Sequence, residues 1–169
     1  MKIRDQPEVS GYTIFCDDIR YEIDGKINYI GCYPSTIFIH ASFPFTILRL
    51  CFAATLLQRR ENFDPNIEIR IFLPGDATDA PSFVAEMKET SEGAIAEQTA
   101  KQVEGLPLSD QRIIAMHTRI VATGLTVKEP GMINVRAVRK GELIRLGGIR
   151  VVPGQGQASP PPTANPAND

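Results

Sequence analysis

The sequence predicts a mainly β protein, a single antiparallel β-sandwich of immunoglobulin-like or C2-like architecture. Short runs rich in β-branched and aromatic residues alternate with turn signals along most of the chain. One run, at residues 67–73, alternates apolar with charged side chains, as a half-buried antiparallel strand does. Only residues 92–104 have a helix-forming composition, so we expect one short helix or a mobile insertion and no helical layer.

Length and composition bound the class of protein. A chain of 169 residues is long enough for one domain with a hydrophobic core. Its 18 basic and 20 acidic residues leave a formal charge of -2, so we expect no nucleic-acid partner, which would need a broad positive field. The chain has no apolar leader and no apolar run of membrane-spanning length, so we expect no membrane partner either.

The cysteines predict the compartment. Cys16, Cys32 and Cys51 are odd in number and lack the spacing of metal ligands. In a chain without a secretory leader, such residues are typical of reduced and mostly buried thiols. We therefore expect a cytoplasmic protein.

Residues 15–33 predict a β-hairpin around which the other strands are arranged. Asp24-Gly25 separates two runs of β-branched and aromatic residues, and this dipeptide favours the positive φ angles of a two-residue type I′ turn. Such a turn places Arg20 opposite Tyr29. One face of the hairpin, which we expect to face the core, then carries these residues: Phe15, Ile19, Ile23 and Ile30. A register slip of one residue would exchange the two faces.

The other face of this hairpin is the predicted binding surface. It carries Arg20, Glu22, Tyr29 and Tyr33 on the side that the core does not need. Tyrosine and arginine are favoured at protein interfaces because they combine apolar area with a polar tip. We therefore expect these four residues to contact a protein partner.

Two parts of the sequence resemble a family of uncharacterised bacterial proteins. The opening C-D-D-I-R, the D-G-K turn and the G-C-Y that follows are similar to the start of that family. The later run P-G-M-I-N-V-R-A-V resembles its penultimate strand. The resemblance implies a small β-rich domain. It implies no activity, so no catalytic residue is carried over.

The remaining segments predict strands and domain boundaries. We interpret residues 1–10 as a flexible lead-in and residues 11–152 as the sandwich domain. Residues 153–169 contain no large apolar side chain and predict a disordered Pro/Gly/Ala-rich tail. Within the domain we expect strands at these positions: 36–40, 46–58, 67–73, 112–123, 131–138 and 143–152. Residues 112–123 also fit a helical period, but the hairpin that follows favours a strand.

Two chemical sites are weaker alternatives. A nucleophilic Cys16 needs a base, and neither His40 nor His117 stands at a recognised spacing from it. Carboxylates at these positions could supply oxygen ligands to a divalent cation: Asp17, Asp18 and Asp24 in the hairpin, and Asp76 and Asp79 in a later loop. Calcium requires six to eight oxygens, and the hairpin carboxylates lie at different heights and on different faces.

The sequence therefore predicts a non-enzymatic module that binds a protein partner or serves as a structural accessory domain. We predict no catalytic residue, no metal and no cofactor. The alternative is a domain that binds a divalent cation or a small ligand through the aspartates. The third hypothesis is an enzyme that uses Cys16.

Overall fold

The computed structural model describes residues 8–87 and 113–154, and these residues form strands and one short 3-10 turn. The predicted mainly β class is confirmed. The strands are β1 (Val9–Cys16), β2 (Asp18–Tyr21), β3 (Ile27–Ile30), β4 (Thr36–Ile39), β5 (Phe45–Arg59), β6 (Ile67–Phe72), β7 (Phe83–Met87), β8 (Ile113–Val127), β9 (Gly131–Arg139) and β10 (Glu142–Pro153).

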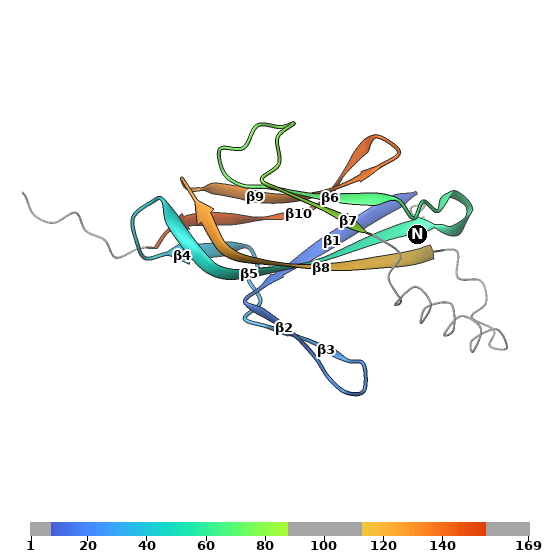
Figure 1. Cartoon of the computed structure of the whole chain (residues 1–169), viewed down its shortest axis with the longest axis horizontal. Helices are drawn as coiled ribbons and strands as arrows, with labels where there is room; N and C mark the ends of the chain where they lie inside the picture. The colour runs from blue at the N-terminus through green and yellow to red at the C-terminus, as the bar shows by residue number, and fades with distance from the viewer. Residues whose placement is uncertain (1–7, 88–112, 155–169) are drawn as a thin grey trace, which may run out of the picture.

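Two sheets form the layers of a sandwich, and a two-stranded hairpin projects from it (Figure 1). The first sheet has the order β1-β5-β8, and both of its pairings are antiparallel. The second has the order β4-β10-β9-β6-β7, and its one parallel pairing joins β4 to β10. The hairpin β2-β3 lies beyond the first sheet on the side away from the second (Figure 1).

The core lies between the two sheets. The inner face of β5 contributes Leu50, Phe52 and Leu56, all fully buried, and the second sheet contributes the isoleucines of β6 and the apolar residues of β9 and β10. Phe15 of β1 meets Phe52 edge to face, with ring centroids 5.7 Å apart. β1 also approaches the second sheet closely at Gly11. A Cβ atom added there would lie only 2.5 Å from the Leu146 side chain.

The inner face of β5 does not alternate regularly at the start of the strand. Strict alternation would place Leu48 on the face of Leu50, but the Leu48 side chain is 83% exposed, whereas Ile47 is buried. The faces exchange between Ile47 and Leu50, beside Gly124 of β8, which has a φ of 66°. β5 curves strongly at this end (Figure 1), and alternation along the sequence cannot report such a bend.

The other predicted strands are confirmed with shifts of a few residues at their ends. Residues 9–10, predicted as part of the lead-in, already belong to β1, and Pro153 still belongs to β10. The predicted helix or insertion at 92–104 lies outside the described residues, as do residues 1–7 and 155–169 of the predicted lead-in and tail. Among the described residues, no helix has the length and apolar character to cross a membrane.

Candidate functional site

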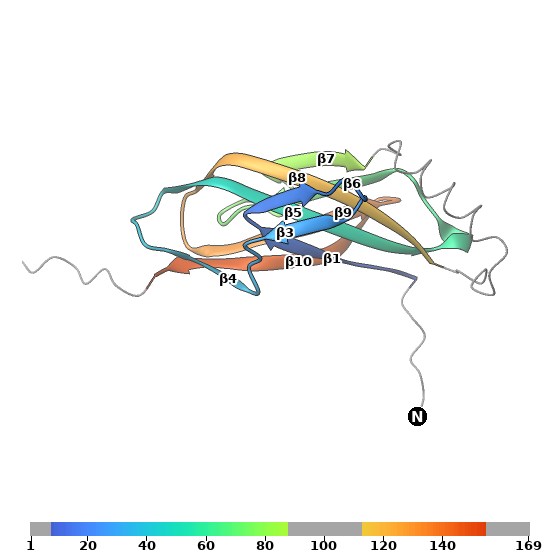
Figure 2. The ribbon, with the colours of Figure 1, turned by 90° about the horizontal axis from the view of Figure 1, so that it is seen from below.

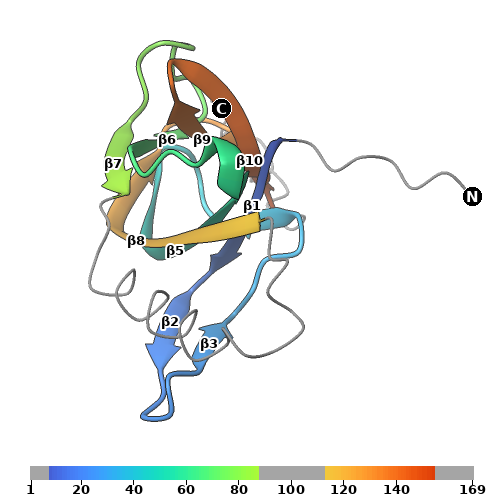
Figure 3. The ribbon, with the colours of Figure 1, turned by 90° about the vertical axis from the view of Figure 1, so that its right-hand side faces the viewer.

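Within the part of the chain that the structure describes, the hairpin β2-β3 projects clearly from the sandwich (Figure 3). It follows β1 after the single residue Asp17 and runs away from the outer face of the first sheet (Figure 3). The view from below shows the hairpin in front of that sheet (Figure 2). None of the eight residues in its two strands is buried.

The prediction that a turn at Asp24-Gly25 joins two paired strands is confirmed, but the predicted type of turn is wrong. The loop has three residues, 23–25, because the Glu22 amide donates to the Lys26 carbonyl at 2.9 Å. The Gly25 amide in turn donates to the Glu22 carbonyl at 3.0 Å. Gly25 has a φ of 81°, whereas Asp24 has no positive φ. A three-residue loop that ends in a left-handed glycine is a common alternative to type I′.

The longer loop shifts the register by one residue. Arg20 lies opposite Asn28, and Tyr29 lies opposite Ile19. The predicted pairing of Arg20 with Tyr29 is therefore wrong, and Tyr29 shares its face with Ile19 and Tyr21. The predicted core positions of Ile23 and Ile30 are wrong as well. Ile23 stands fully exposed at the tip, and Ile30 is exposed on the face opposite to Ile19.

The structure does not bring the four predicted binding residues to one surface. Arg20 is exposed and donates to Asp18 at 3.2 Å. Glu22 is exposed and accepts a hydrogen bond from Asn28 at 2.5 Å. Tyr29 is half-buried on the opposite face of the hairpin, and Tyr33 is half-buried against the edge of the core.

Exposed apolar side chains mark the hairpin surface instead. Ile23 at the tip has 110% relative exposure, Tyr21 has 61% and Ile30 has 39%. The sequence feature that could have indicated this surface is Ile23, which directly precedes the Asp24-Gly25 turn. Alternation along the strand assigned that residue to the core, because alternation alone does not reveal whether a second layer covers the strand.

The root of the hairpin is tied to β1. The Tyr33 amide donates to the Phe15 carbonyl at 2.8 Å, and the Asp17 amide donates to the Ile30 carbonyl at 3.0 Å. The Tyr33 hydroxyl donates to the Asp17 carboxylate. Burial, and then this bond to Asp17, raises the pKa of Tyr33 to about 12.

Two further contacts attach the hairpin to the first sheet. Asp18 pairs with Arg49 of β5 at 2.6 Å and accepts from the Ile19 amide at 2.9 Å. Its bond with Arg20, and then these contacts, lower the pKa of Asp18. The guanidinium of Arg119 on β8 lies 4.7 Å from the centroid of the Tyr21 ring and donates to its hydroxyl at 2.5 Å. The hairpin therefore contacts all three strands of that sheet.

The candidate cation ligands do not gather. Asp17 accepts from Tyr33, Asp18 pairs with two arginines, and Asp24 pairs with Lys26. Asp76 uses its Oδ2 atom to accept from the amides of residues 73 and 82, at 2.8 Å and 3.0 Å. In the described parts of the chain, no group of three or more histidine, cysteine, aspartate or glutamate residues could hold a metal ion.

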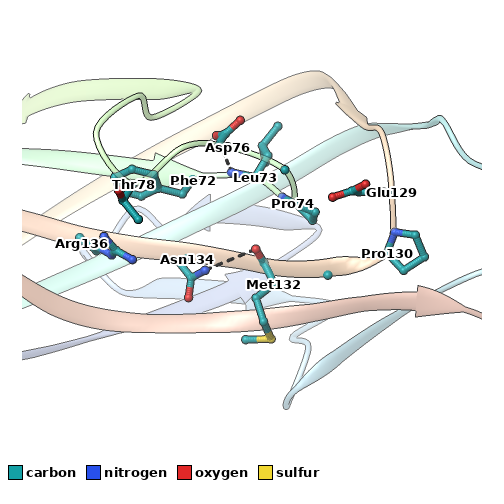
Figure 4. A pocket seen from close by; sticks show the side chains of 12 residues that line it. Phe72, Leu73, Pro74, Asp76, Thr78, Glu129, Pro130, Met132, Asn134 and Arg136 are labelled. Carbon is teal, nitrogen blue, oxygen red and sulfur yellow. Dashed lines mark hydrogen bonds between the residues drawn. The ribbon is translucent and has the colours of Figure 1, made fainter.

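A shallow pocket of about 240 Å³ lies between the loop that follows β6 and the turn that precedes β9 (Figure 4). Asp76 and Glu129 line it together with Arg136, whose guanidinium lies 4.6 Å from the Phe72 ring centroid. The sequence analysis named Asp76 as a candidate ligand but did not identify Arg136. In the sequence, Arg136 is only one polar residue of an alternating strand. A pocket with one cation and two carboxylates matches no single class of ligand.

The Cys16 thiol is shielded from solvent. Its side chain is fully buried, and burial, followed by the neighbouring thiols, raises its pKa to about 12. A thiol with this pKa stays protonated at neutral pH, which disfavours nucleophilic catalysis. His117 lies on β8 with its Nδ1 atom 3.0 Å from the Thr55 hydroxyl, and His40 lies beside Gly154.

No protein-family model matches the chain, and no curated protein or solved structure matches it significantly either. The resemblance described above therefore stays a prediction.

Proposed function

We propose that this protein is a non-enzymatic binding module that engages a protein partner through the hairpin β2-β3. The observation that carries the proposal is a projecting hairpin that exposes Tyr21, Ile23 and Ile30 while its root is tied to the sandwich. We also propose that the sandwich has an immunoglobulin-like or C2-like fold. Folds of this kind present loops and hairpins for recognition.

The composition of the hairpin favours a protein over a small ligand. A tyrosine and two isoleucines are exposed among Arg20, Glu22 and Lys26. Ile23 stands at the tip, and Tyr21 and Ile30 lie on opposite faces of the hairpin, so a partner that encloses the hairpin would contact apolar and charged side chains together. Because the root is already held by hydrogen bonds, binding would order few groups, which lowers the entropic cost of association.

We place this function in the cytoplasm of a bacterium. Cys16, Cys32 and Cys51 all carry free thiols, which suits a reducing compartment. The proposal needs no cofactor, no nucleic acid and no membrane.

Site-specific crosslinking tests the proposal. A photo-reactive amino acid at position 23 should crosslink to a discrete partner in the native host. The matched control places it at position 140, in the exposed turn between β9 and β10. We expect a distinct adduct at position 23 and none at position 140.

A second variant separates binding from folding. Ile23→Asp should keep the melting temperature of the wild type, because the side chain packs against nothing in the fold. It should also abolish capture of the partner identified by the adduct. An adduct that forms equally at both positions, or a partner retained by Ile23→Asp, would contradict the proposal.

A further inference from the structure

All three cysteines of the chain lie close together at the end of β1. Cys16 at the end of β1 is the register partner of Cys51 on β5. The hairpin then returns the chain to the other side of β1 and delivers Cys32 there. Residues 16, 32 and 51 are far apart in sequence, so only the fold creates this cluster.

Hydrogen bonds at the hairpin root bring Cys32 beside Cys16. The Tyr33 amide donates to the Phe15 carbonyl at 2.8 Å, and the Asp17 amide donates to the Ile30 carbonyl at 3.0 Å, so Cys16 and Cys32 lie between these two bonds. Cys32 is also one of the neighbours that raise the pKa of Cys16. Phe15 and Tyr33 pack toward the core. Because side chains alternate along β1, Cys16 lies on the opposite side of the strand from Phe15. The Cys32 thiol donates to the Tyr29 carbonyl at 3.7 Å.

This geometry is compatible with a disulfide. Paired residues of antiparallel strands have Cα atoms about 4.5–5.5 Å apart, and disulfides span Cα separations of about 4.4–6.8 Å. Cys51 is the register partner of Cys16 and hydrogen-bonds with its thiol, and Cys32 lies on the other side of β1. Access decides which neighbour reacts.

Only one of the three thiols meets the solvent. Cys32 is exposed, whereas Cys16 and Cys51 are completely buried. A small oxidant therefore encounters the Cys32 sulfur first. Cys51 is one strand further from Cys32, and its thiol donates to the Asp17 carbonyl at 3.5 Å.

We propose that Cys32 and Cys16 form an oxidation site for hydroperoxides. The Cys32 sulfur attacks the outer peroxide oxygen, the O–O bond breaks, and the products are a Cys32 sulfenic acid and an alcohol, or water when the oxidant is hydrogen peroxide. The Cys16 sulfur then displaces hydroxide from the sulfenic acid. The thiol proton leaves with that hydroxide as water, and a Cys16–Cys32 disulfide remains.

The two thiols have different roles in this sequence. Burial holds the pKa of Cys16 at about 12, so this thiol is protonated at neutral pH and is a poor first nucleophile. It serves as the resolving thiol, which needs only to lie beside the sulfenic acid. The disulfide would join the end of β1 to the root of the hairpin. The site does not depend on the proposed partner.

Peptide mapping of the full chain tests the site. Trypsin places the three cysteines on separate peptides, residues 5–20, 27–49 and 50–59. The reduced protein is treated with hydrogen peroxide, blocked with N-ethylmaleimide and digested without reductant. We expect peptide 5–20 to be linked to peptide 27–49 and the link to disappear on reduction with dithiothreitol.

Three variants assign the steps. Cys51→Ala is the matched control and should keep the link. Cys16→Ala should leave the Cys32 sulfenic acid unresolved, to be trapped by dimedone on peptide 27–49. Cys32→Ser should leave Cys16 reduced at the same peroxide dose. Because Cys32 is exposed, this last variant tests the site even if Cys16→Ala fails to fold.

Several results would overturn the proposal. One is a link between peptides 5–20 and 50–59, which would assign the disulfide to the buried pair. Another is a dimer joined through Cys32 as the main product. A third is oxidation of Cys32 beyond the sulfenic acid with no link to Cys16.

Discussion

The hairpins β2-β3 and β9-β10 turn differently although both turns end in glycine. In β2-β3 the loop has three residues, 23–25, and only Gly25 has a positive φ. In β9-β10 the loop is Lys140-Gly141, with φ angles of 49° and 81°. Two positive φ angles are the mark of a type I′ turn. The turn expected at Asp24-Gly25 is therefore found at Lys140-Gly141.

Burial explains the difference. β9 buries apolar residues at alternating positions, among them Val135, and β10 buries Leu146, Ile149 and Val151 around an irregularity between Arg145 and Gly147. A slip of one residue would turn these side chains to the solvent, so the core imposes the register. The strands of β2-β3 contain no buried residue, and their register follows from local hydrogen bonds at the tip and the root. A buried face determines register more strongly than a turn dipeptide does.

The largest expected effect is a core truncation in the second hairpin. Leu146→Ala should lower the free energy of unfolding by about 2–5 kcal/mol, because it removes buried methyl groups and leaves a cavity. Ile23→Ala in the first hairpin should change it by less than about 0.5 kcal/mol. Urea unfolding measures both. Equal losses would mean that the first hairpin shares the core.

The next largest expected effect comes from replacing the last glycine of each turn with alanine. Gly25 and Gly141 both have a φ of 81°, and a Cβ at either position would meet no atom within 4 Å. Each Gly→Ala change should therefore cost about 1–3 kcal/mol of local backbone strain.

The two substitutions should differ in where this strain is measured. Gly141→Ala should lower the urea midpoint of the whole domain. Gly25→Ala should mainly accelerate amide exchange in β2 and β3, because the hairpin can open without the core. A similar fall in the urea midpoint for both variants would show that the hairpins are energetically equivalent.

Alkaline pH tests the root of the first hairpin. In the folded protein the pKa of Cys16 is raised from 9.0, and that of Tyr33 from 10.0, each to about 12. The folded state then binds more protons than the unfolded chain, so stability is full below pH 9 and falls as the pH rises toward 12.

Urea midpoints between pH 8 and pH 12 would measure this fall. Tyr33→Phe should make the fall shallower between pH 10 and pH 12, and Cys16→Ala should do so from pH 9. Slopes identical to the wild type in both variants would exclude these groups as the cause.

The smallest expected effect concerns the contact between Tyr21 and Arg119. Tyr21→Ala should reduce the protection of the β2-β3 amides by about 0.5–1 kcal/mol, the usual contribution of an exposed cation–π pair. Tyr21→Phe keeps the ring over the guanidinium and should lose less. Amide exchange in β9-β10 should not change in either variant; if it does, the contact supports the whole sandwich.

The sequence by itself determined most of the strands, although β7 and the first part of β1 were not among those predicted. In β6, isoleucines at 67, 69 and 71 alternate with Glu68 and Arg70, and the structure buries the isoleucines. The long apolar run of β5 predicted a strand, and it lies at the centre of its sheet. These predictions succeed because alternation with a period of two is a local property, which each segment carries without its neighbours.

The tertiary structure decided the site. Tyr33 belongs to the edge of the core, Leu48 is exposed where β5 bends, and Ile23 has no layer above it. The three cysteines meet because β1 pairs with β5 on one side and with the returning hairpin on the other. Each of these facts depends on which distant segments become neighbours. That choice is made by the packing of the whole chain, and no short stretch of sequence contains it.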